Sequence, residues 1–477
     1  MCDSVCVGVE SGDTDDGTAW SWTLWRSAPS KKGELVLERL CTRLTTTMRQ
    51  LSDERAEKAG ITRFFRNRNV TVQEIVETAA ARTAEAAAGR HVLIIEDTSE
   101  INYQAKSGRK RGLGTVGNGT DIGLFVHPAL AVNAADGSIL GLAGATIWRR
   151  FTAKQPHYQC LPIEEKESYR WLATAKAARQ ALAETAAMCT VVADREADIY
   201  EVLARIPDEH THVLVRAHHD RALIVKGQKG SRLFTTIASW SEAGRISFDM
   251  VARPGRPARK VTLAVRFGEV TLCQPKPGAD KHDPKQITIN VVEAREIDPP
   301  SEKEAVVWRL FTTHAVTSLA DAARMIEFYR RRWTIEQLFR TMKSQGLDLQ
   351  ESLLSDGEAL ERLAAATLVA AVQAMQLVHA RGEAGHTLPA ARLFDQAEIT
   401  VLYALITKLE GKTDKQKNPH PRLSLAWAAW PIARLGGWNG YATERPPGPI
   451  TFIRGLERFH AIVDGFNLAS TNDVWIR

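Results

Sequence analysis

The first part of the chain changes from an aperiodic segment to a long helical pattern. Residues 1–33 carry Gly, Ser, Asp and three tryptophans, and we expect much of this segment to be poorly ordered. From Glu34 to about Ala88, apolar residues recur at spacings of three and four positions, as they do along one face of a helix. This pattern predicts a helical amino-terminal region.

Within that region, residues 62–70 interleave three arginines with two phenylalanines. Such a segment is typical either of a solvated turn between helices or of a contact with a DNA backbone. The residues alone do not separate these alternatives. If the segment contacts DNA, Arg63 is the candidate residue.

Two apolar runs further along the chain each end in an acid. Residues 91–96 lead to Asp97, and residues 189–193 lead to Asp194. Short continuous apolar runs predict strands that are buried on both faces. Asp97 and Asp194 would then lie where these strands end. Taken singly, either acid is more typical of a loop start or a helix cap.

The segments around these acids alternate between strand and helix patterns. Strands are predicted at about 124–133, 139–149 and 212–216, and a helix at about 164–188. The last of these strands ends in Arg216, a second candidate for a DNA contact. Residues of about 221–312 differ, because strand patterns there are separated by Pro, Gly and Lys; they predict an inserted antiparallel module.

Residues 329–343 predict a helix with an unusual polar face. With Tyr329 as origin and an advance of about 100° per residue, Arg332, Glu336 and Lys343 fall at roughly −60°, −20° and −40°. One narrow face thus carries a phenol, a carboxylate and two cations. A carboxylate can hold a divalent metal, and Arg and Lys can hold phosphate oxygens. Beyond residue 358 the chain is again helical in pattern.

Composition limits the class of protein only loosely. The 477 residues are 44% hydrophobic and 25% charged, typical of a globular protein with two to four domains. A net charge of +6 permits nucleic-acid binding without requiring it. Six scattered cysteines without a CxxC pair, and no signal peptide, favour the cytoplasm. The most apolar stretch, 363–378, is shorter than the roughly 20 residues of a membrane span and predicts a buried helix.

Three acids, Asp97, Asp194 and Glu336, can converge from two strand ends and a helix. Such a set of oxygen ligands suits Mg²⁺, for which Mn²⁺ can substitute. Two ions about 4 Å apart would serve an in-line displacement at phosphorus. A glycosidase built on a carboxylate pair would leave the Arg and Lys side chains without a role.

The sequence resembles the bacterial cut-and-paste DDE transposases of the insertion-sequence-four group, which contains the transposon-five enzyme. The resemblance covers about residues 60–465, and its most specific part is the signature Y-(2)-R-(3)-E-(6)-K. The matching residues are Ile95-Glu-Asp97-Thr, Arg111-Gly-Leu-Gly, His127-Pro-Ala-Leu-Ala, Glu165-Lys-Glu-Ser-Tyr-Arg-Trp171, Ala193-Asp194-Arg-Glu-Ala-Asp198, Tyr329, Arg332, Glu336, Lys343 and Ile432-Ala-Arg-Leu-Gly-Gly437.

The resemblance implies an α/β protein with an RNase H-like, mixed-sheet catalytic core at 91–375, which contains the β-rich insertion. It implies a helical domain at 34–90 that binds transposon ends and a helical dimerisation domain at 376–477. The implied partners are double-stranded DNA and a second copy of the chain in a homodimer, with no membrane. The implied reaction is an Mg²⁺-dependent nick, a hairpin, hairpin opening and strand transfer, in the cytoplasm at the nucleoid.

The resemblance also implies residue roles. Asp97, Asp194 and Glu336 would bind two metal ions, while Tyr329, Arg332 and Lys343 would hold phosphates near the scissile bond. Trp308 lies where the family has a residue that stacks on a flipped base, although a core tryptophan in a buried strand is an equally good interpretation of its sequence context.

One segment departs from the family. A Leu-Gly-Asp-x-Arg segment that helps to recognise transposon ends has no counterpart, and residues 27–33 occupy about its position. This departure leaves open a homologue that inhibits transposition by pairing with full-length protein. A second, separate alternative is a cellular RNase H-like nuclease that never joins strands.

Overall fold

The structure is a computed structural model that describes residues 30–151, 157–225, 227–250, 258–276, 278–301, 304–343, 346–441 and 444–471. Most of the segment expected to be poorly ordered, up to residue 29, lies outside the described residues. Residues 30–33, in contrast, already belong to the first helix.

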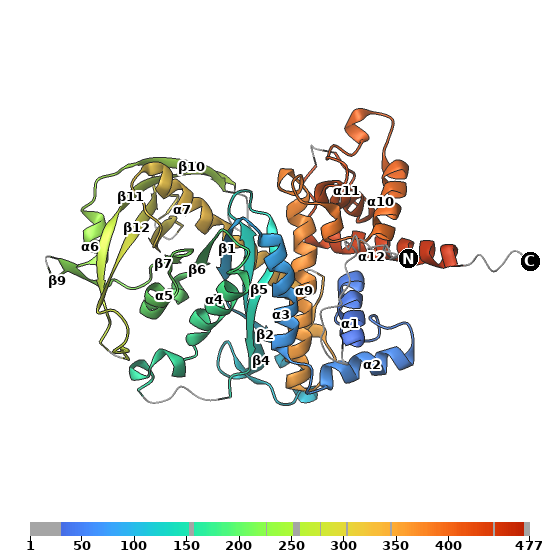
Figure 1. Ribbon diagram of the computed structural model, residues 1–477, viewed down its shortest axis with the longest axis horizontal. Coiled ribbons are helices and arrows are strands. Elements are labelled where there is room, and N and C mark those ends of the chain that lie inside the picture. Colours follow the sequence, from blue (N-terminus) through green and yellow to red (C-terminus); the bar gives the residue numbers. More distant parts are fainter. Residues whose placement is uncertain are drawn as a thin grey trace, which may run out of the picture.

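The strands lie on one side of the molecule with several helices among them, and the first and last helices of the chain lie on the other side (Figure 1). The helices are α1 (Ser30–Arg43), α2 (Arg55–Arg66), α3 (Val72–Ala87), α4 (Tyr169–Leu182), α5 (Tyr200–Arg205), α6 (Leu233–Ala238), α7 (Leu319–Arg331), α8 (Trp333–Lys343), α9 (Gly357–Ala380), α10 (Gln396–Leu409), α11 (Leu425–Leu435) and α12 (Pro449–Thr471). The strands are β1 (His91–Glu96), β2 (Ser99–Asn102), β3 (Gly114–Val116), β4 (Asp121–Asn133), β5 (Ile139–Trp148), β6 (Met188–Ala193), β7 (Thr211–Arg216), β8 (Ala222–Val225), β9 (Gln228–Arg232), β10 (Gly244–Met250), β11 (Arg259–Cys273), β12 (Gln286–Glu296) and β13 (Val307–Thr312).

One mixed sheet organises the fold. Its order is β2-β4-β1-β6-β7-β13-β12-β11-β8-β9, with β3 and β5 also paired to β4 and β10 to β11. The pairs β1–β6 and β6–β7 are parallel, whereas β4 runs antiparallel to both β1 and β5. The predicted α/β class with a mixed sheet is confirmed, and the predicted strands at both acids are present.

Each face of the sheet covers its own apolar core, because successive side chains of a strand point to opposite faces. On one face, Leu93, Ile95 and Val192 pack with residues of α7, α8 and α9. On the other, Ile94 and Val191 pack with residues of α4, α5 and α6. Asp97 follows Ile95 by two positions, and Asp194 follows Val192 by two. Both acids therefore face the α7–α8 side of the sheet.

The predicted insertion is β-rich, but it is not a separate module. Its strands β12 and β11 continue the central sheet through β13, which pairs with β7. Strand β11 runs unbroken over 15 residues, and α6 lies within the insertion, where no helix was predicted. The continuous ladder of hydrogen bonds makes insertion and core one sheet.

Helix α9 is the central helix of the helical side and lies between the sheet and the carboxyl-terminal helices (Figure 1). Among the described residues it is the one helix long and apolar enough to cross a membrane, yet 83% of its apolar window is buried inside the protein. The predicted buried core helix is thus confirmed. The predicted domain boundary at 375/376 falls inside α9, so the carboxyl-terminal region shares this helix with the core.

Two predicted helices differ in extent. The helix predicted at about 164–188 begins later and ends earlier, as α4. The helix predicted over residues 329–343 is divided at Arg332 into α7 and α8, so its polar residues do not lie on one unbroken helix.

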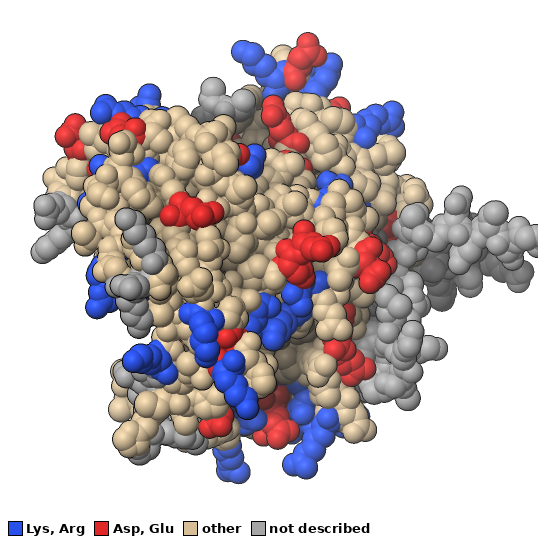
Figure 2. Space-filling model, turned by 60° about the vertical axis from the view of Figure 1, so that its left-hand side comes forward, with Lys and Arg blue, Asp and Glu red and all other residues tan. Residues whose placement is uncertain are grey.

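Charge is distributed unevenly over the surface. On the face drawn in Figure 2, many Lys and Arg side chains gather in the lower half, acidic side chains lie between them, and broad areas are uncharged. The net charge of +6 is therefore not concentrated in a single-sign stripe on the coloured part of that face.

A buried arginine fastens the amino-terminal helices to α9. Arg362 donates to the carbonyl of Phe65, in the last turn of α2, at 3.0 Å and to the carbonyl of Val70, between α2 and α3, at 2.6 Å. Replacing Arg362 with Met should lower the free energy of unfolding by about 3 kcal/mol, because two buried carbonyls lose charged donors. Chemical denaturation measures this change.

The matched control is Glu358→Gln. Glu358 also pairs with Arg362, but its side chain is 44% exposed, so the change should be below about 1 kcal/mol. Equal losses in the two variants would show that the carbonyl contacts of Arg362 do not stabilise the fold.

Candidate active site

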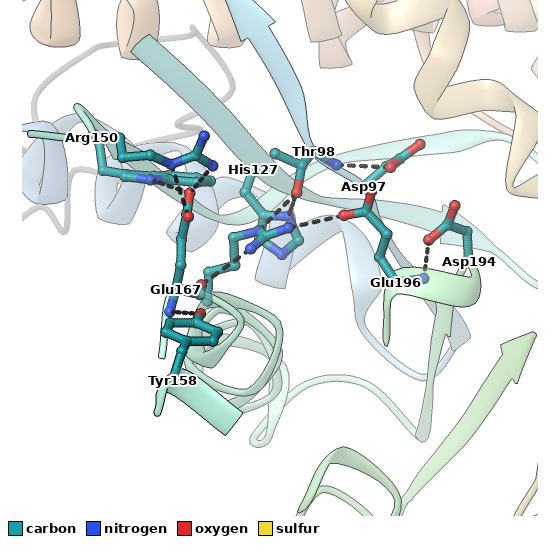
Figure 3. Close-up of polar contacts among 10 residues, drawn as sticks. Asp97, Thr98, His127, Arg150, Tyr158, Glu167, Asp194 and Glu196 are labelled. Carbon is teal, nitrogen blue, oxygen red and sulfur yellow. Dashed lines mark hydrogen bonds and ion pairs between the residues drawn. The ribbon is translucent and has the colours of Figure 1, made fainter. Parts of the chain in front are cut away.

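Two of the predicted acids lie side by side at one edge of the sheet. Ile95 pairs with Val192 in the parallel β1–β6 ladder, so Asp97 and Asp194 each follow that pair by two residues. Neighbouring strands are about 4.8 Å apart, which brings the two carboxylates close together. Figure 3 shows Asp97 and Asp194 next to each other beyond these strand ends.

A backbone N–H group fixes one oxygen of each acid. Thr98 N donates to Asp97 Oδ1 at 2.8 Å, and Glu196 N donates to Asp194 Oδ1 at 2.8 Å. The second contact makes Asp194 the N-cap of a 3-10 turn at Arg195–Ala197. Asp194 thus has the capping role that its sequence context allows, and its Oδ2 lies outside that bond.

Arg332 connects the third acid to this pair. Its Nη1 donates to Asp97 Oδ2 and its Nη2 to Glu336 Oε1, both at 2.7 Å. Around Arg332 the backbone bonds span three residues instead of four, from Arg332 N to Tyr329 O and from Ile335 N to Arg332 O. This local tightening separates α7 from α8 at the point where the guanidinium turns toward the sheet edge.

The electrostatic balance at Asp97 raises the pKa of its carboxyl group. Burial raises the pKa of Asp97 from 3.8 to about 6, and the Asp194 charge adds to this, although Arg332 acts in the opposite direction. For Arg332, burial alone would lower the pKa, but Tyr329, Asp97, Glu336 and Asp194 together raise it. The guanidinium therefore stays charged while it neutralises part of the acidic cluster.

Two other predicted residues lie at the same edge. Ala193 pairs with Val215, so Arg216 lies beside Asp194 at the end of β7. Arg216 donates hydrogen bonds to the Val307 carbonyl, at 3.1 Å, and to the Tyr329 hydroxyl. Tyr329 belongs to α7, and its ring is buried in the core between α7 and the sheet. This burial raises the pKa of the Tyr329 hydroxyl.

Trp308 has the contacts of a packed residue. Its ring stacks on Phe248 with a centroid distance of 6.1 Å and meets the Tyr329 ring edge-on at 5.6 Å. It is half-buried against the core on the α7 side. Trp308 thus has the packing contacts of the core tryptophan in the alternative interpretation, and its stacking on a flipped base stays a prediction.

Lys343 and Arg63 lie apart from the acids. Lys343 ends α8, where burial lowers its pKa and Glu100 acts against this change. Arg63 is exposed near the end of α2, and its Nε bonds the Ala59 carbonyl at 3.4 Å. The structure brings Asp97, Asp194, Glu336, Tyr329, Arg332 and Arg216 together and leaves Arg63 remote in chain and fold.

The donor set fits a hard divalent cation, although the present side-chain arrangement does not enclose one. Asp97, Asp194 and Glu336 offer carboxylate oxygens of the kind that Mg²⁺ and Mn²⁺ bind. Within the described ranges, no three His, Cys, Asp or Glu side chains are grouped closely enough to hold a metal ion. In this arrangement Arg332 lies between Asp97 and Glu336 and forms an ion pair with each.

Sequence reasoning missed the residues that support this edge. These residues are Thr98, Arg170 and Glu196: Arg170 donates from Nε to Thr98 Oγ1 and from Nη2 to Glu196 Oε2. Their partners are up to 72 residues apart in the chain, so no local pattern connects them. The segment 165–171, which carries part of the family resemblance, was the available signal.

The raised pKa of Asp97 predicts a pH-dependent stability difference. The pKa of Asp97 is about 6 in the folded protein and lower in the unfolded chain. The stability that protonated Asp97 contributes is therefore fully present below pH 4 and is lost as the pH rises through 6. In EDTA, Asp97→Asn should therefore gain stability relative to the wild type, by about 3 kcal/mol, between pH 4 and pH 7. Melting temperatures across this range measure the gain.

Asp321→Asn gives a control of opposite sign. Asp321, in the first turn of α7, forms a capping box with the N-cap Ser318, and hydrogen bonds, first from Ser318, lower the pKa of Asp321 to about 2. Its stabilisation is present above pH 4, so this variant should be less stable than the wild type throughout pH 4–7. A flat difference for Asp97→Asn over the same range would contradict the burial cost assigned to Asp97.

Comparison with known protein families gives one match. Residues 172–372 match the family model described as the transposase DDE domain. The matched segment contains Asp194, Glu336 and the Arg332 bridge, and it begins after Asp97. The chain thus carries a transposase DDE domain, a metal-dependent phosphoryl transferase that acts on DNA.

Proposed function

We propose that the protein is a cut-and-paste DNA transposase of the insertion-sequence-four group. The observation that carries this proposal is the meeting of Asp97, Asp194 and Glu336 around Arg332, in a chain with a transposase DDE domain. The Tyr329, Arg332, Glu336 and Lys343 spacing supports the narrower group assignment.

The central sheet supports an RNase H-like core. Strands β5, β4 and β1 form an antiparallel set, and β1, β6 and β7 continue it in parallel. We assign Asp97 and Asp194 to the two neighbouring parallel strands of this core, and Glu336 to the helix that covers the same face. The carboxyl-terminal helices α10, α11 and α12 are assigned to homodimer formation.

Asp97, Asp194 and Glu336 would hold two Mg²⁺ ions, with Mn²⁺ as a substitute. Bound ions would activate the attacking oxygen and stabilise the leaving oxygen at phosphorus. For these acids to act as ligands, Arg332 must release Asp97 Oδ2 and Glu336 Oε1. The released guanidinium is then available to a phosphate, which it can bind through two parallel hydrogen bonds.

The DNA strand would run past the edge defined by β6 and β7. Arg216 and Tyr329 lie beside Asp194, and Lys343 lies toward Glu100 at the other end of α8. We assign phosphate contacts to these side chains and to Arg332, and a more distant contact to Arg63. A flipped base would use the face of Trp308 that Phe248 now covers.

The proposed reaction is a nick at each transposon end, formation and opening of a hairpin, and transfer of the 3′ end into target DNA in the bacterial cytoplasm. The rival function, inhibition by a homologue that binds without cutting, rests on the missing Leu-Gly-Asp-x-Arg segment. Purified protein, Mg²⁺ and a duplex with the element's terminal repeat separate them. Nicks and hairpins support the enzyme, while a stable complex without cleavage supports the inhibitor.

The same assay separates a transposase from a nuclease that never joins strands. A pre-cleaved end is incubated with plasmid, and joined products are measured by gel electrophoresis. Strand transfer supports the transposase, whereas cleavage without any joining would support the nuclease.

Replacing Glu336 with Gln should reduce cleavage by at least about 10³-fold, because a metal ligand loses its charge while its shape is kept. DNA affinity, measured by gel shift in EDTA, should change little. Glu327→Gln is the control, since Glu327 lies on α7 and pairs with Arg330 and Arg331 instead. Normal cleavage by the Glu336 variant would refute the metal assignment.

Replacing Lys343 with Ala should weaken binding to a terminal-repeat duplex and reduce the slope of log K against log salt by about one, because one phosphate contact is lost. Lys408→Ala, an exposed position on α10, is the control and should keep the wild-type slope. If both variants keep the slope, Lys343 makes no phosphate contact.

A further inference from the structure

A chain of hydrogen bonds links the two acids, Asp97 and Asp194, through residues on the α4 side of the sheet. Asp97 Oδ1 accepts from Thr98 N, and Thr98 Oγ1 accepts from Arg170 Nε at 2.9 Å. Arg170 Nη2 donates to Glu196 Oε2 at 3.0 Å, and Glu196 N donates to Asp194 Oδ1. Figure 3 shows Thr98 and Glu196 beside their acids, with the dashed lines that join them.

We propose that Arg170 is a positioning residue that sets the separation and orientation of the Asp97 and Asp194 carboxylates for divalent-metal binding. This inference rests on the proposed function, since it concerns the same site. It assigns to α4, on the opposite face of the sheet from Glu336, a role in the geometry of the metal ligands. Arg170 itself touches neither acid.

The geometry requires an arginine. A guanidinium is planar and presents its donors in a fixed fork, so Nε and Nη2 hold Thr98 and Glu196 at a set distance. A lysine offers one nitrogen on a flexible stem and cannot fix that distance. The Arg170 side chain is only 14% exposed, and its third donor, Nη1, bonds the Glu167 carbonyl of its own chain segment.

The surroundings of Arg170 restrict its movement. Its guanidinium lies 5.4 Å from the Trp148 ring centroid and 5.5 Å from that of Trp171. Arg170 donates to the backbone carbonyl of Glu167, and the Glu167 carboxylate accepts from Arg150 and from the Trp148 indole. Figure 3 shows Arg150, Glu167 and Tyr158 in this adjoining cluster. These contacts therefore restrict the movement of the Arg170 guanidinium.

A buried histidine fixes the Thr98 hydroxyl as well. Thr98 Oγ1 lies 2.9 Å from His127 Nδ1, and His127 is fully buried. Thr98 Oγ1 also accepts from Arg170 Nε, so two side chains hold the hydroxyl. The Thr98 backbone N–H, in turn, donates to Asp97.

Arg170 leaves one oxygen of each acid to other partners. The chain of bonds uses Oδ1 of Asp97 and Oδ1 of Asp194, while Arg332 takes Asp97 Oδ2 from the opposite side. Supporting residues of this kind orient metal ligands, and their loss typically costs 10–100-fold in metal affinity. The same reasoning applies to Arg170.

The test is Mn²⁺ affinity, measured by titration calorimetry on the full chain with and without a terminal-repeat duplex. Arg170→Gln and Arg170→Lys should each weaken Mn²⁺ binding by roughly 10-fold or more. A purely electrostatic role predicts the opposite sign for Gln, because removing a cation near two acids should tighten cation binding. Unchanged or tighter binding by Arg170→Gln would overturn the proposal.

Arg179 supplies the matched control. It lies on the same helix, α4, and pairs with Asp208 and the Ile206 carbonyl, away from the acids. Arg179→Gln should retain wild-type Mn²⁺ affinity. If it weakens Mn²⁺ binding as much as Arg170→Gln does, the effect belongs to α4 in general and the proposal fails.

Thr98→Val provides a second variant without a change in charge. It keeps the backbone N–H that binds Asp97 but removes the hydroxyl that Arg170 and His127 hold. It should weaken Mn²⁺ binding in the same direction as Arg170→Gln. Wild-type affinity in this variant would overturn the proposed link between Arg170 and Asp97.

Cleavage assays keep this inference separate from the proposed function. If the wild type binds Mn²⁺ in an Arg170-dependent way but never cuts DNA, the transposase proposal fails and the positioning role stands. If the wild type cuts DNA and Arg170→Gln keeps normal metal affinity, only the positioning role fails. A wild type that binds no Mn²⁺ under either condition would overturn both.

Discussion

The site depends on one constraint, which is the closeness of two carboxylates at adjacent parallel strand ends. Their register is fixed by the β1–β6 ladder, so Asp97 and Asp194 cannot separate without breaking sheet hydrogen bonds. Two unit charges about 5 Å apart repel by roughly 3 kcal/mol at an effective dielectric constant of 20. Burial adds to this cost, as the raised pKa of Asp97 shows, and Arg332 offsets part of it.

Helices on both faces of the sheet hold the two strand-end acids in place. On one side, α7 and α8 bring Arg332 and Glu336, and the break between these helices lets Arg332 reach Asp97. On the other side, α4 brings Arg170 to the residues that follow each acid. The long strands of the insertion continue the sheet and support β7, whose last residue is Arg216.

The sequence predicts best those features that depend on residues close together in the chain. Asp97 and Asp194 were found because each follows a short apolar run, and Glu336 because its helix has a charged face. Helix periodicity could not reveal the break at Arg332, since that break accompanies ion pairs to a residue 235 positions away. Arg170 was missed for the same reason, because its contacts with Thr98 and Glu196 exist only in the folded chain.

Arg332 occupies the space between Asp97 and Glu336 and has the same sign of charge as a metal ion that these acids would bind. A metal ion bound at this site would therefore compete with Arg332 for Asp97 Oδ2. A DNA phosphate would change the balance, because it offers the guanidinium two new acceptors and brings a negative charge to the edge. Binding of DNA and release of the carboxylates by Arg332 should then favour each other, since a shared side chain couples the two events.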